Sequence, residues 1–438
     1  MNVCVVALGK IGLPLAVQFA RSGHQTIGAD VNAGTVEMIN NGVVPFPGEA
    51  NLDEYLVEEI ASGRFHATTD TTDAVRRSEV VIVVVPLVVD AAAQPEFAAL
   101  DAASRSIAAG LQPGTIVIYE TTLPVGTTRQ RFAPMLAEIS GLTLGTELFV
   151  AFSPERVYSG RIFSDLRRYP KLVGGIDTPS TERAIAFYEA GLQFDERTDL
   201  AHPNGVWNLR TSEAAELAKL AETTYRDVNI AFANELARFA DNHGIDVLDV
   251  IDSCNSQPFS HIHRPGIAVG GHCIPVYPRF YLAGDPGAQL PRAARNVNDA
   301  MPAYAVQLLE QQIGALRGLR IAVLGAAYRG GVKETAFSGV FPTVAALQDA
   351  GAEAVVHDPL FTDDELRALG LEPYHFGEHC AAAIVQAEHT EYDDLDSHSL
   401  GGATVVLDGR SSVHAHPDLT IITIGGGSHP HTHESTSC

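Results

Sequence analysis

The sequence predicts an α/β fold in which two doubly wound, Rossmann-like domains with parallel sheets are joined by a long central helix. In the first 200 residues, apolar runs of strand length alternate with helical patterns, which is typical of a parallel sheet covered by helices on both faces. A second set of strand patterns follows residue 316. Between them, residues 211–243 contain neither Pro nor Gly and carry apolar side chains at helical spacing, which predicts one long helix.

The strands of the first domain are expected at VCVVAL, QTIGAD, VVIVVVP, TIVIYET and LFVAFSP, with a helix from Leu13 to Ser22 after the first of them. Those of the second domain are expected at RIAVLGAAY, AEAVVHDP, AAIVQA, TVVLDGR and LTIITIG. We therefore divide the chain into a first α/β domain, a central helical region, a second α/β domain and a tail, at 1–200, 201–300, 301–424 and 425–438. The tail is rich in Gly, Ser, His and Thr, so it is expected to be disordered.

The composition limits the partners of the chain. Its 438 residues carry a formal net charge of −24, which argues against binding nucleic acid or an anionic membrane through a basic surface. The N-terminus begins directly with a strand pattern, and no apolar run reaches the about 20 residues that span a bilayer. We therefore expect a cytoplasmic protein with neither nucleic acid nor membrane as a partner.

The cysteines and the tail histidines give no metal site. The cysteines are odd in number and lack the spacing of a disulfide framework or a zinc site. The histidines of the tail are interpreted as solvated residues rather than metal ligands. These residues are Cys4, Cys254, Cys273, Cys380 and Cys438, and His429, His431 and His433.

A dinucleotide site is predicted at the N-terminus. Ala7, Gly9 and Gly12 occupy the three small-residue positions of G-x-G-x-x-G between a strand and a helix, where the backbone can approach a pyrophosphate at the positive end of the helix dipole. Asp30 ends the next strand, at about the 20-residue spacing of the fingerprint. An ordinary strand-to-helix turn would explain the glycines but not the acid. A carboxylate there binds the ribose and repels a 2′-phosphate, which favours NAD over NADP.

A cysteine lies in a glycine-rich loop, in GGHCIPV. Taken alone, Cys273 would be interpreted as a buried small hydrophobic residue. However, spaced segments over nearly the whole chain, up to about Arg410, resemble the family of UDP-glucose and UDP-N-acetylhexosamine 6-dehydrogenases. SPER and GGHCIPV are more similar to the N-acetylhexosamine branch. The segments are ALGKIGLPLA, VVVP, ETTLPVGTT, SPERVYSG, ELAKLAETTYRDVNIAFANELA, PGIAVGGHCIPV, VLGAAYRGGVKE, VVHDP and VVLDGR.

The resemblance implies an NAD domain, a central helix used in dimerisation and a C-terminal domain that holds UDP. It also implies oxidation of C6 of a nucleotide sugar to the acid through a thiohemiacetal and a thioester on Cys273. Lys219 would stabilise the oxyanion and Glu155 would position or deprotonate water. Thr122 would lie near the nicotinamide. Without the resemblance, Lys219 would be a solvated helix residue and Glu155 an exposed acid.

Binding residues follow from the same resemblance. Tyr328 and Arg329 match a pair that contacts the uridine diphosphate, and Arg410 matches an arginine at the substrate. Without the resemblance, both arginines would be ordinary surface charges. The expected cofactor-binding residues are Gly9, Lys10, Ile11, Gly12, Asp30, Val85, Pro86 and Thr122. The expected substrate-binding residues are Glu155, Arg156, Val157, Lys219, Gly270, Tyr328, Arg329 and Arg410.

Four positions depart from the family pattern. Ala7 replaces the first glycine of the fingerprint, and Ala336 stands where an arginine is usual. Thr223 and Tyr277 replace an asparagine and an aspartate that assist the chemistry, so we count both among the catalytic positions. Three interpretations stay open: complete oxidation to the acid, an NAD-using enzyme that stops at another oxidation level or is redox-neutral, and an idle binding protein. The apolar stripe expected on the long helix favours a homodimer.

Overall fold

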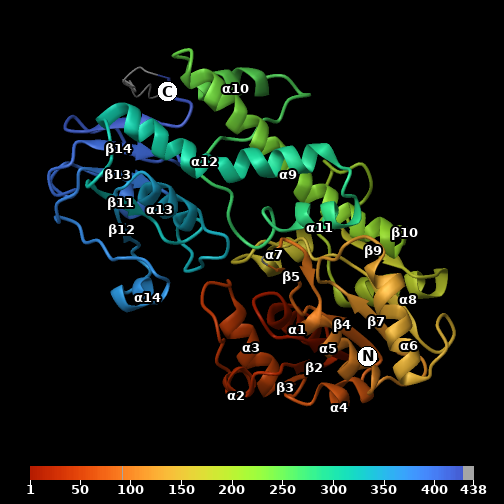
Figure 1. Ribbon diagram of the computed structural model, residues 1–438. Coiled ribbons are helices and arrows are strands. Elements are labelled where there is room, and N and C mark those ends of the chain that lie inside the picture. The colour runs from red at the N-terminus through yellow and green to blue at the C-terminus, as the bar shows by residue number, and fades with distance from the viewer. Residues whose placement is uncertain (91, 428–438) are drawn as a thin grey trace. The chain divides into compact units, whose positions relative to one another are not determined.

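The computed structural model describes residues 1–90 and 92–427 (Figure 1). These residues form two compact units. Unit 1 contains residues 1–222 and 279–284, and unit 2 contains residues 223–278 and those from 285 onward. The histidines predicted for the tail, and Cys438, lie outside the described residues. Residues 425–427 of the expected tail are held in place, because the Gly425 N–H donates to Asp241 and its carbonyl accepts from Val247.

Unit 1 is built on an eight-stranded sheet with the order β10-β9-β8-β7-β4-β1-β2-β3. From β3 to β8 the strands are parallel, and their order reverses on either side of β1, as a doubly wound fold requires. β9 runs antiparallel to β8, and β10 is parallel to β9. The strands are β1 Asn2–Val6, β2 Gln25–Ala29, β3 Phe65–Thr68, β4 Val80–Val83, β7 Ile116–Tyr119, β8 Phe149–Phe152, β9 Lys171–Gly175 and β10 Val206–Thr211.

Helices connect these strands. The first, α1, packs on the sheet through Leu13, Val17 and Phe19, all fully buried, and these side chains belong to the apolar core of the unit. Asp177 caps α8 by accepting the N–H of Ser180. The helices are α1 Gly12–Arg21, α2 Ala33–Asn40, α3 Leu52–Ala61, α4 Thr71–Arg76, α5 Ala98–Ala108, a π-helical turn Thr128–Phe132, α6 Ala133–Ser140, α7 Ile162–Arg168 and α8 Thr178–Gly191; β5 Val88–Val89 and β6 Pro95–Glu96 form a small antiparallel pair.

The sheet of unit 1 ends at β10, which carries the single tryptophan of the chain. The indole N–H of Trp207 donates to the carbonyl of Pro203 at 2.8 Å. His202 meets the indole edge-on, with ring centroids 5.7 Å apart. These contacts hold the side chain at the edge of the sheet.

The expected long helix is confirmed as α9, Ser212–Asp241. Within unit 2 it packs on α12, Gln289–Ile313, through buried polar contacts. Arg295 of α12 donates to Asp227 at 2.6 Å, and Asn234 donates to Asn298 at 2.9 Å. Two further helices are α10 Val247–Asn255, in unit 2, and α11 Tyr277–Gly284, whose residues from Arg279 onward belong to unit 1.

Unit 2 contains a five-stranded parallel sheet with the order β12-β11-β13-β14-β15. The order reverses between β11 and β13, so this sheet is also doubly wound, and the predicted fold class is confirmed. Its elements are β11 Arg320–Leu324, α13 Val340–Asp349, β12 Glu353–His357, α14 Asp363–Ala368, β13 Ala382–Val385, a 3₁₀ turn Thr390–Tyr392, β14 Val405–Asp408 and β15 Thr420–Thr423.

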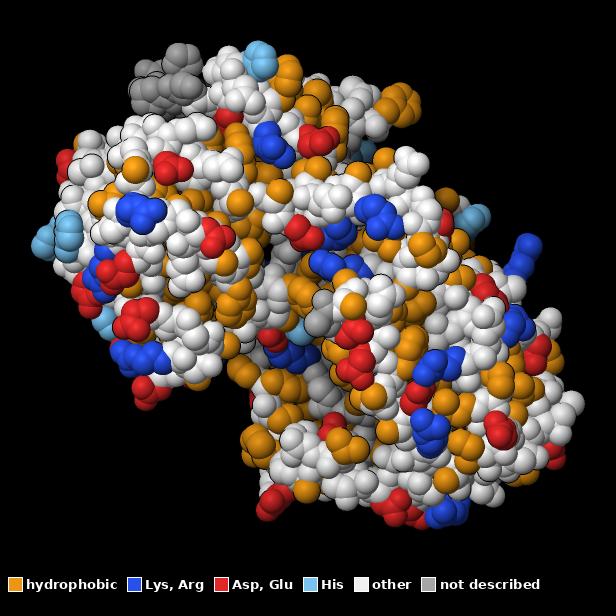
Figure 2. Space-filling view, viewed as in Figure 1, with side chains coloured by type: hydrophobic (Ala, Val, Ile, Leu, Met, Phe, Trp, Pro, Cys, Tyr) orange, Lys and Arg blue, Asp and Glu red, His pale blue; other side chains and the backbone are white. Residues whose placement is uncertain are grey.

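In the part of the chain that the structure describes, no helix is long and apolar enough to cross a membrane. Figure 2 shows one face, on which Lys and Arg side chains lie interspersed with Asp and Glu.

Candidate active site

The loop after β1 lies where the strand order of unit 1 reverses. Ala7 adopts a left-handed backbone conformation with φ of 75°. A side chain at Gly12 would lie 1.8 Å from the carbonyl oxygen of Ala7, whereas one at Gly9 would meet no atom within 4 Å. Gly12 is therefore needed for packing of α1 against the loop, and the backbone at Gly9 faces open space, as close approach of a phosphate requires.

Asp30 follows β2 and is fixed beside this loop. Its carboxylate accepts the N–H of Leu8 at 2.8 Å and that of Asn32 at 2.9 Å. The side chain remains partly exposed, so it can also accept from a ribose. An open backbone at the start of α1, with Lys10 and Ile11 in the turn and an anchored acid next to it, fits the ADP-ribose half of NAD.

The segments after β4 and β7 reach the same edge of the sheet. The hydroxyl of Thr121 donates to the carbonyl of Val85 at 2.7 Å, which holds the two segments together. Pro86 is exposed and Thr122 is 5% exposed. The structure therefore brings these predicted cofactor residues to the carboxyl ends of β4, which neighbours β1, and of β7, which neighbours β4.

A buried acid that the sequence did not point to holds the loop that follows Thr122. Glu216 of α9 accepts the N–H groups of Gly126 and Thr128 and the hydroxyl of Thr128, at 2.6, 2.9 and 2.7 Å. Burial raises the pKa of Glu216 to about 7, although these donors oppose the shift. The loop 121–128 is thus fastened to the first turns of α9.

Glu155 follows β8, and its side chain is only 10% exposed. The expectation of an exposed acid, made without the family resemblance, is therefore wrong. Its carboxylate accepts the N–H groups of Arg156 and Val157 at 2.6 and 3.1 Å and the ammonium of Lys171 at 2.8 Å. Burial disfavours the charged form, but Lys171 and the backbone donors outweigh it and hold the pKa of Glu155 below its ordinary value. A carboxylate of lowered pKa is a weak base, which favours positioning of water over its deprotonation.

Two further predicted substrate-binding residues of unit 1 are Arg156 and Lys219. Arg156 makes two hydrogen bonds to Glu222 of α9, at 3.1 and 3.2 Å. Lys219 is 9% exposed, so the alternative of a solvated helix residue is also wrong.

In unit 2, Cys273 lies in the turn that leads into α11. Its thiol is exposed, which excludes the interpretation as a buried small residue. The Cys273 carbonyl accepts the N–H of Tyr277 at 2.9 Å. Side chains at Gly270 and Gly271 would lie 2.7 and 3.1 Å from atoms of Tyr328. The two glycines therefore let the cysteine loop lie against that tyrosine.

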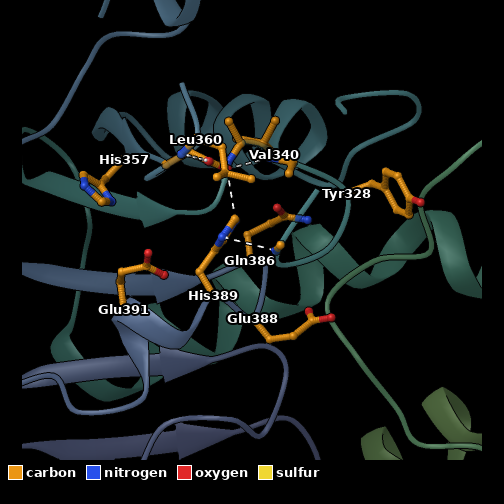
Figure 3. Close-up of polar contacts among 12 residues, drawn as sticks. Tyr328, Val340, His357, Leu360, Gln386, Glu388, His389 and Glu391 are labelled. Atoms are coloured by element: carbon orange, nitrogen blue, oxygen red, sulfur yellow. Dashed lines mark hydrogen bonds and ion pairs between the residues drawn. The ribbon is translucent and has the colours of Figure 1, made fainter. Parts of the chain in front are cut away.

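The loop after β11 carries Tyr328 and Arg329, and buried groups hold it. The Asp358 carboxylate accepts the N–H groups of Ala326 and Ala327 at 2.8 and 2.9 Å. His389 lies 3.3 Å from Asp358 and accepts the N–H of Gly331 at 3.4 Å (Figure 3). In Figure 3 the side chain of Glu388 points away from that of His389.

Arg410 joins three backbone segments of unit 2. Its guanidinium donates to the carbonyls of Gln386, Ala268 and Tyr328 at 2.7, 3.2 and 3.4 Å. Its side chain is 18% exposed, so the alternative of an ordinary surface charge is wrong. By these contacts Arg410 ties the cysteine loop to the Tyr328 loop.

Each unit contains its own set of predicted site residues. Unit 1 brings together the cofactor residues, Thr122 and Glu155, and it also contains Lys219. Unit 2 brings together Gly270, Cys273, Tyr328 and Arg410. Sequence reasoning missed the supporting groups, although an acid or a lysine at the end of a buried apolar run, as in IVIYE and KLVGG, is an available signal. These missed residues are Glu120, Lys171, Glu216, Asp358 and His389.

Sequence models of the UDP-glucose/GDP-mannose dehydrogenase family match the chain in three parts. The NAD-binding domain matches residues 1–191, the central domain residues 213–300 and the UDP-binding domain residues 322–415. The UDP-N-acetyl-D-mannosamine dehydrogenase of Pyrococcus horikoshii is 34% identical, over 95% of this chain and 97% of that protein. An NDP-N-acetyl-D-galactosaminuronic acid dehydrogenase of Ralstonia nicotianae is 31% identical, over 93% and 95%.

Solved structures agree with these matches. The structure of the Pyrococcus horikoshii UDP-D-ManNAc dehydrogenase superposes with a TM-score of 0.86 at 31% identity, covering 97% of this chain and 99% of that one. A UDP-glucose dehydrogenase from Pyrobaculum islandicum gives 0.81 at 26% identity, covering 94% of each. The predicted resemblance is confirmed, and the chain belongs to the UDP-glucose/GDP-mannose dehydrogenase family of NAD-dependent enzymes that oxidise nucleotide sugars.

Proposed function

We propose that the chain oxidises C6 of a UDP-N-acetylhexosamine to the carboxylate, with Cys273 as the nucleophile. The observation that carries the proposal is the exposed thiol in a glycine-supported loop held against Tyr328. The N-acetylated sugar is supported by similarity to enzymes named for UDP-N-acetyl-D-mannosamine and an NDP-N-acetyl-D-galactosaminuronic acid.

NAD, when bound in unit 1, accepts one hydride in each of two oxidation steps. The Cys273 thiolate adds to the C6 aldehyde to form a thiohemiacetal, which becomes a thioester on loss of the second hydride. Lys219 stabilises the oxyanion at C6, and Glu155 orients the water that releases the acid and regenerates the thiol. The full reaction consumes one alcohol, one water and two NAD, and it yields one carboxylate, two NADH and three protons.

The departures at Thr223 and Tyr277 support a second candidate, an enzyme in which the thioester is released slowly or not at all. Tyr277 is bonded through its backbone to the carbonyl of Cys273, so the departure from the family aspartate stands in the same turn as the nucleophile. Thr223 is buried on α9, four residues after Lys219. Slow hydrolysis would give a burst of NADH followed by a low steady rate.

The decisive experiment incubates the enzyme and NAD with a panel of UDP-, dTDP- and GDP-sugars and identifies the product at C6 by mass spectrometry. Complete oxidation gives the acid and two NADH per sugar. A burst with a covalent adduct on the protein supports the second candidate, and restoring the family residues with Tyr277→Asp and Thr223→Asn should then raise the steady rate. Tight NAD binding with no reduction on any sugar would mean an idle binding protein.

Cys273→Ser tests the nucleophile. The hydroxyl fills the same space but is a far weaker nucleophile near neutral pH, so acid formation should be lost while both ligands still bind. Cys254→Ser, in α10 and outside the cysteine loop, is the matched control and should keep full activity. Acid formation by Cys273→Ser at the rate of the control would contradict the proposal.

The cytoplasm and a homodimer belong to the same proposal. An exposed thiol at Cys273 is best preserved in a reducing compartment. Along α9, Tyr225, Phe232 and Phe239 are 56%, 49% and 60% exposed at a spacing of seven residues, which is an apolar stripe that a twin helix can cover. Light scattering should give a dimer at micromolar concentration, and Phe232→Glu should give monomers. A monomeric unmodified chain would contradict this part.

A further inference from the structure

A cluster of ionisable side chains is buried behind Glu155 in unit 1. Lys171 is the first residue of β9, and β9 runs antiparallel to β8. The start of β9 therefore lies at the same sheet edge as the carboxyl ends of β7 and β8, where Glu120 and Glu155 follow those strands. The side chains of Glu120 and Lys171 are 0% and 5% exposed. Tyr188 of α8 completes the cluster and is fully buried.

The contacts within the cluster are short. The Lys171 ammonium donates to Glu120 at 2.7 Å and to Glu155 at 2.8 Å. The Tyr188 hydroxyl donates to the second oxygen of Glu120 at 2.5 Å. The other carboxylate oxygen of Glu155 accepts the N–H groups of Arg156 and Val157. Lys171 therefore fixes the orientation of Glu155, and Glu155 fixes the turn that carries two predicted substrate-binding residues.

The charges of the cluster do not balance when all groups are ionised. One ammonium faces two buried carboxylates, and an uncompensated buried charge is unfavourable. The two carboxyl groups respond differently. Burial raises the pKa of Glu120 to about 7, because Lys171 offsets it only in part and the charge of Glu155 adds to it. Glu155 stays ionised because it also receives two backbone donors. Near neutral pH the cluster therefore exchanges its proton at Glu120.

We propose that Lys171 is a positioning residue for the oxidation of the nucleotide sugar, which holds Glu155 and the turn 155–157 in place, and that Glu120 behind it sets how firmly they are held. The proposal rests on the proposed function of Glu155. When Glu120 is protonated, the charge of Lys171 is directed to Glu155 alone. When Glu120 ionises, the two carboxylates compete for one ammonium, and the hold on Glu155 weakens.

Glu120→Gln tests this directly, because glutamine has the same shape and cannot ionise. Below about pH 6 the variant and the unmodified enzyme carry the same charge in the cluster, so the ratio of their kcat values should be constant. The ratio should rise in favour of the variant as the pH passes through about 7. Glu147→Gln, in the turn before β8, is the control, and its ratio should stay flat from pH 5.5 to 8.5. A flat ratio for Glu120→Gln would overturn the role of Glu120.

Lys171→Met removes the ammonium and tests the positioning role. We expect kcat for acid formation to fall at least about tenfold, while the affinity for NAD stays unchanged because the Lys171 ammonium bonds to Glu120 and Glu155. Lys171→Arg keeps the charge and should recover part of the loss. Unchanged kcat in Lys171→Met would overturn the inference, and if this variant fails to fold, the pH series on Glu120→Gln decides.

Activity measurements distinguish a wrong role for Lys171 from a wrong function for the enzyme. If the unmodified enzyme forms no acid from any nucleotide sugar, the proposed function fails. If it forms acid and Lys171→Met matches it, only the inference fails. Infrared difference spectroscopy adds a readout without turnover, because a protonated carboxyl band lost near pH 7 should be absent in Glu120→Gln. Glu216→Gln must be recorded alongside, since burial also raises the pKa of Glu216 to about 7.

Discussion

At the end of the first strand of each unit, a glycine-containing loop is held by an aspartate from the end of the neighbouring strand. After β1, Asp30 accepts the N–H of Leu8 at 2.8 Å. After β11, Asp358 accepts the N–H groups of Ala326 and Ala327 at 2.8 and 2.9 Å. Asp30 is partly exposed, whereas Asp358 is 3% exposed and pairs with His389. The same arrangement thus leaves one acid open to a ligand and encloses the other.

The glycines of the two loops differ in the same way. A side chain at Gly9 would meet no atom within 4 Å, but one at Gly330 would lie 1.5 Å from the carbonyl oxygen of Glu388. Gly9 therefore provides space for a ligand, and Gly330 provides space for the protein itself. A glycine loop followed by an acid identifies the strand-to-helix turn of a Rossmann-like sheet, and the space around the glycine decides whether a dinucleotide can bind there.

Replacing each of these two glycines by alanine should reveal the largest difference between the two loops. Gly330→Ala forces a methyl group into backbone and should lower the free energy of unfolding by about 3 kcal/mol, or roughly 6 °C or more in the calorimetric midpoint. Gly9→Ala should leave the midpoint nearly unchanged and weaken NAD binding about tenfold, or about 1.4 kcal/mol. Equal stability losses in the two variants would refute the comparison.

Serine at the two aspartates gives the next largest difference. Asp358→Ser leaves buried N–H groups without their charged acceptor and should cost about 2 kcal/mol of stability. Asp30→Ser should lower the free energy of unfolding by less, because that site is partly open to water. It should, however, reduce the preference for NAD over NADP, measured as the ratio of the two kcat/KM values. Efficient reduction of NADP by the unmodified enzyme would contradict the role given to Asp30.

The pH dependence of stability should have opposite signs at two buried acids. The pKa of Glu216 is raised to about 7, so its folded form keeps a proton that the unfolded chain loses above about 4.5. Its contribution is complete at acid pH and is lost as the pH rises to about 7. Glu216→Gln should reduce this slope by up to about 1.4 kcal/mol per pH unit, measured by urea unfolding across that range.

Asp358 supplies the opposite case. Burial works against ionisation, but His389 and the backbone N–H groups hold the pKa of Asp358 below its ordinary value. Its contribution is present above the pKa of the unfolded chain and is lost as the pH falls through the folded value. The stability of the unmodified protein should therefore fall more steeply below about pH 4 than that of Asp358→Ser, measured by urea unfolding.

Glycine at position 7 should give the smallest effect, in the stabilising direction. Ala7 has a φ of 75° where the corresponding position after β11 is Gly325, with a φ of 107°. A left-handed conformation destabilises the folded state by roughly 1 kcal/mol for a residue other than glycine. Glycine avoids this strain but loses more conformational entropy on folding, which offsets part of the gain in stability. Ala7→Gly should raise the calorimetric midpoint by about 1 to 3 °C, and a lower midpoint would show that the alanine is not strained.

The fold was largely predictable from the sequence because its strands are continuous buried runs and its longest helix contains no breaker. The antiparallel β9 and the edge strand β10 were not predicted, since KLVGG and VWNLRT say nothing about strand direction. At the site, the spacing of glycines and acid predicted the NAD loop. The partner of Glu120 could not be predicted, because Lys171 is 51 residues away in the chain. The exposure of Cys273 and the carbonyl contacts of Arg410 likewise depend on tertiary packing.

The position of Trp207 on β10 has an optical consequence. Trp207 is the single tryptophan of the chain. Fluorescence excited at wavelengths that only tryptophan absorbs therefore comes from unit 1 alone, whereas the fluorescence of the tyrosines comes from both units. The emission of Trp207 also overlaps the absorption of reduced nicotinamide. Energy transfer to NADH bound in unit 1 should therefore quench the emission of Trp207. The tryptophan signal also reports the unfolding of unit 1, so the order in which the two units unfold can be measured by comparing it with the tyrosine signal.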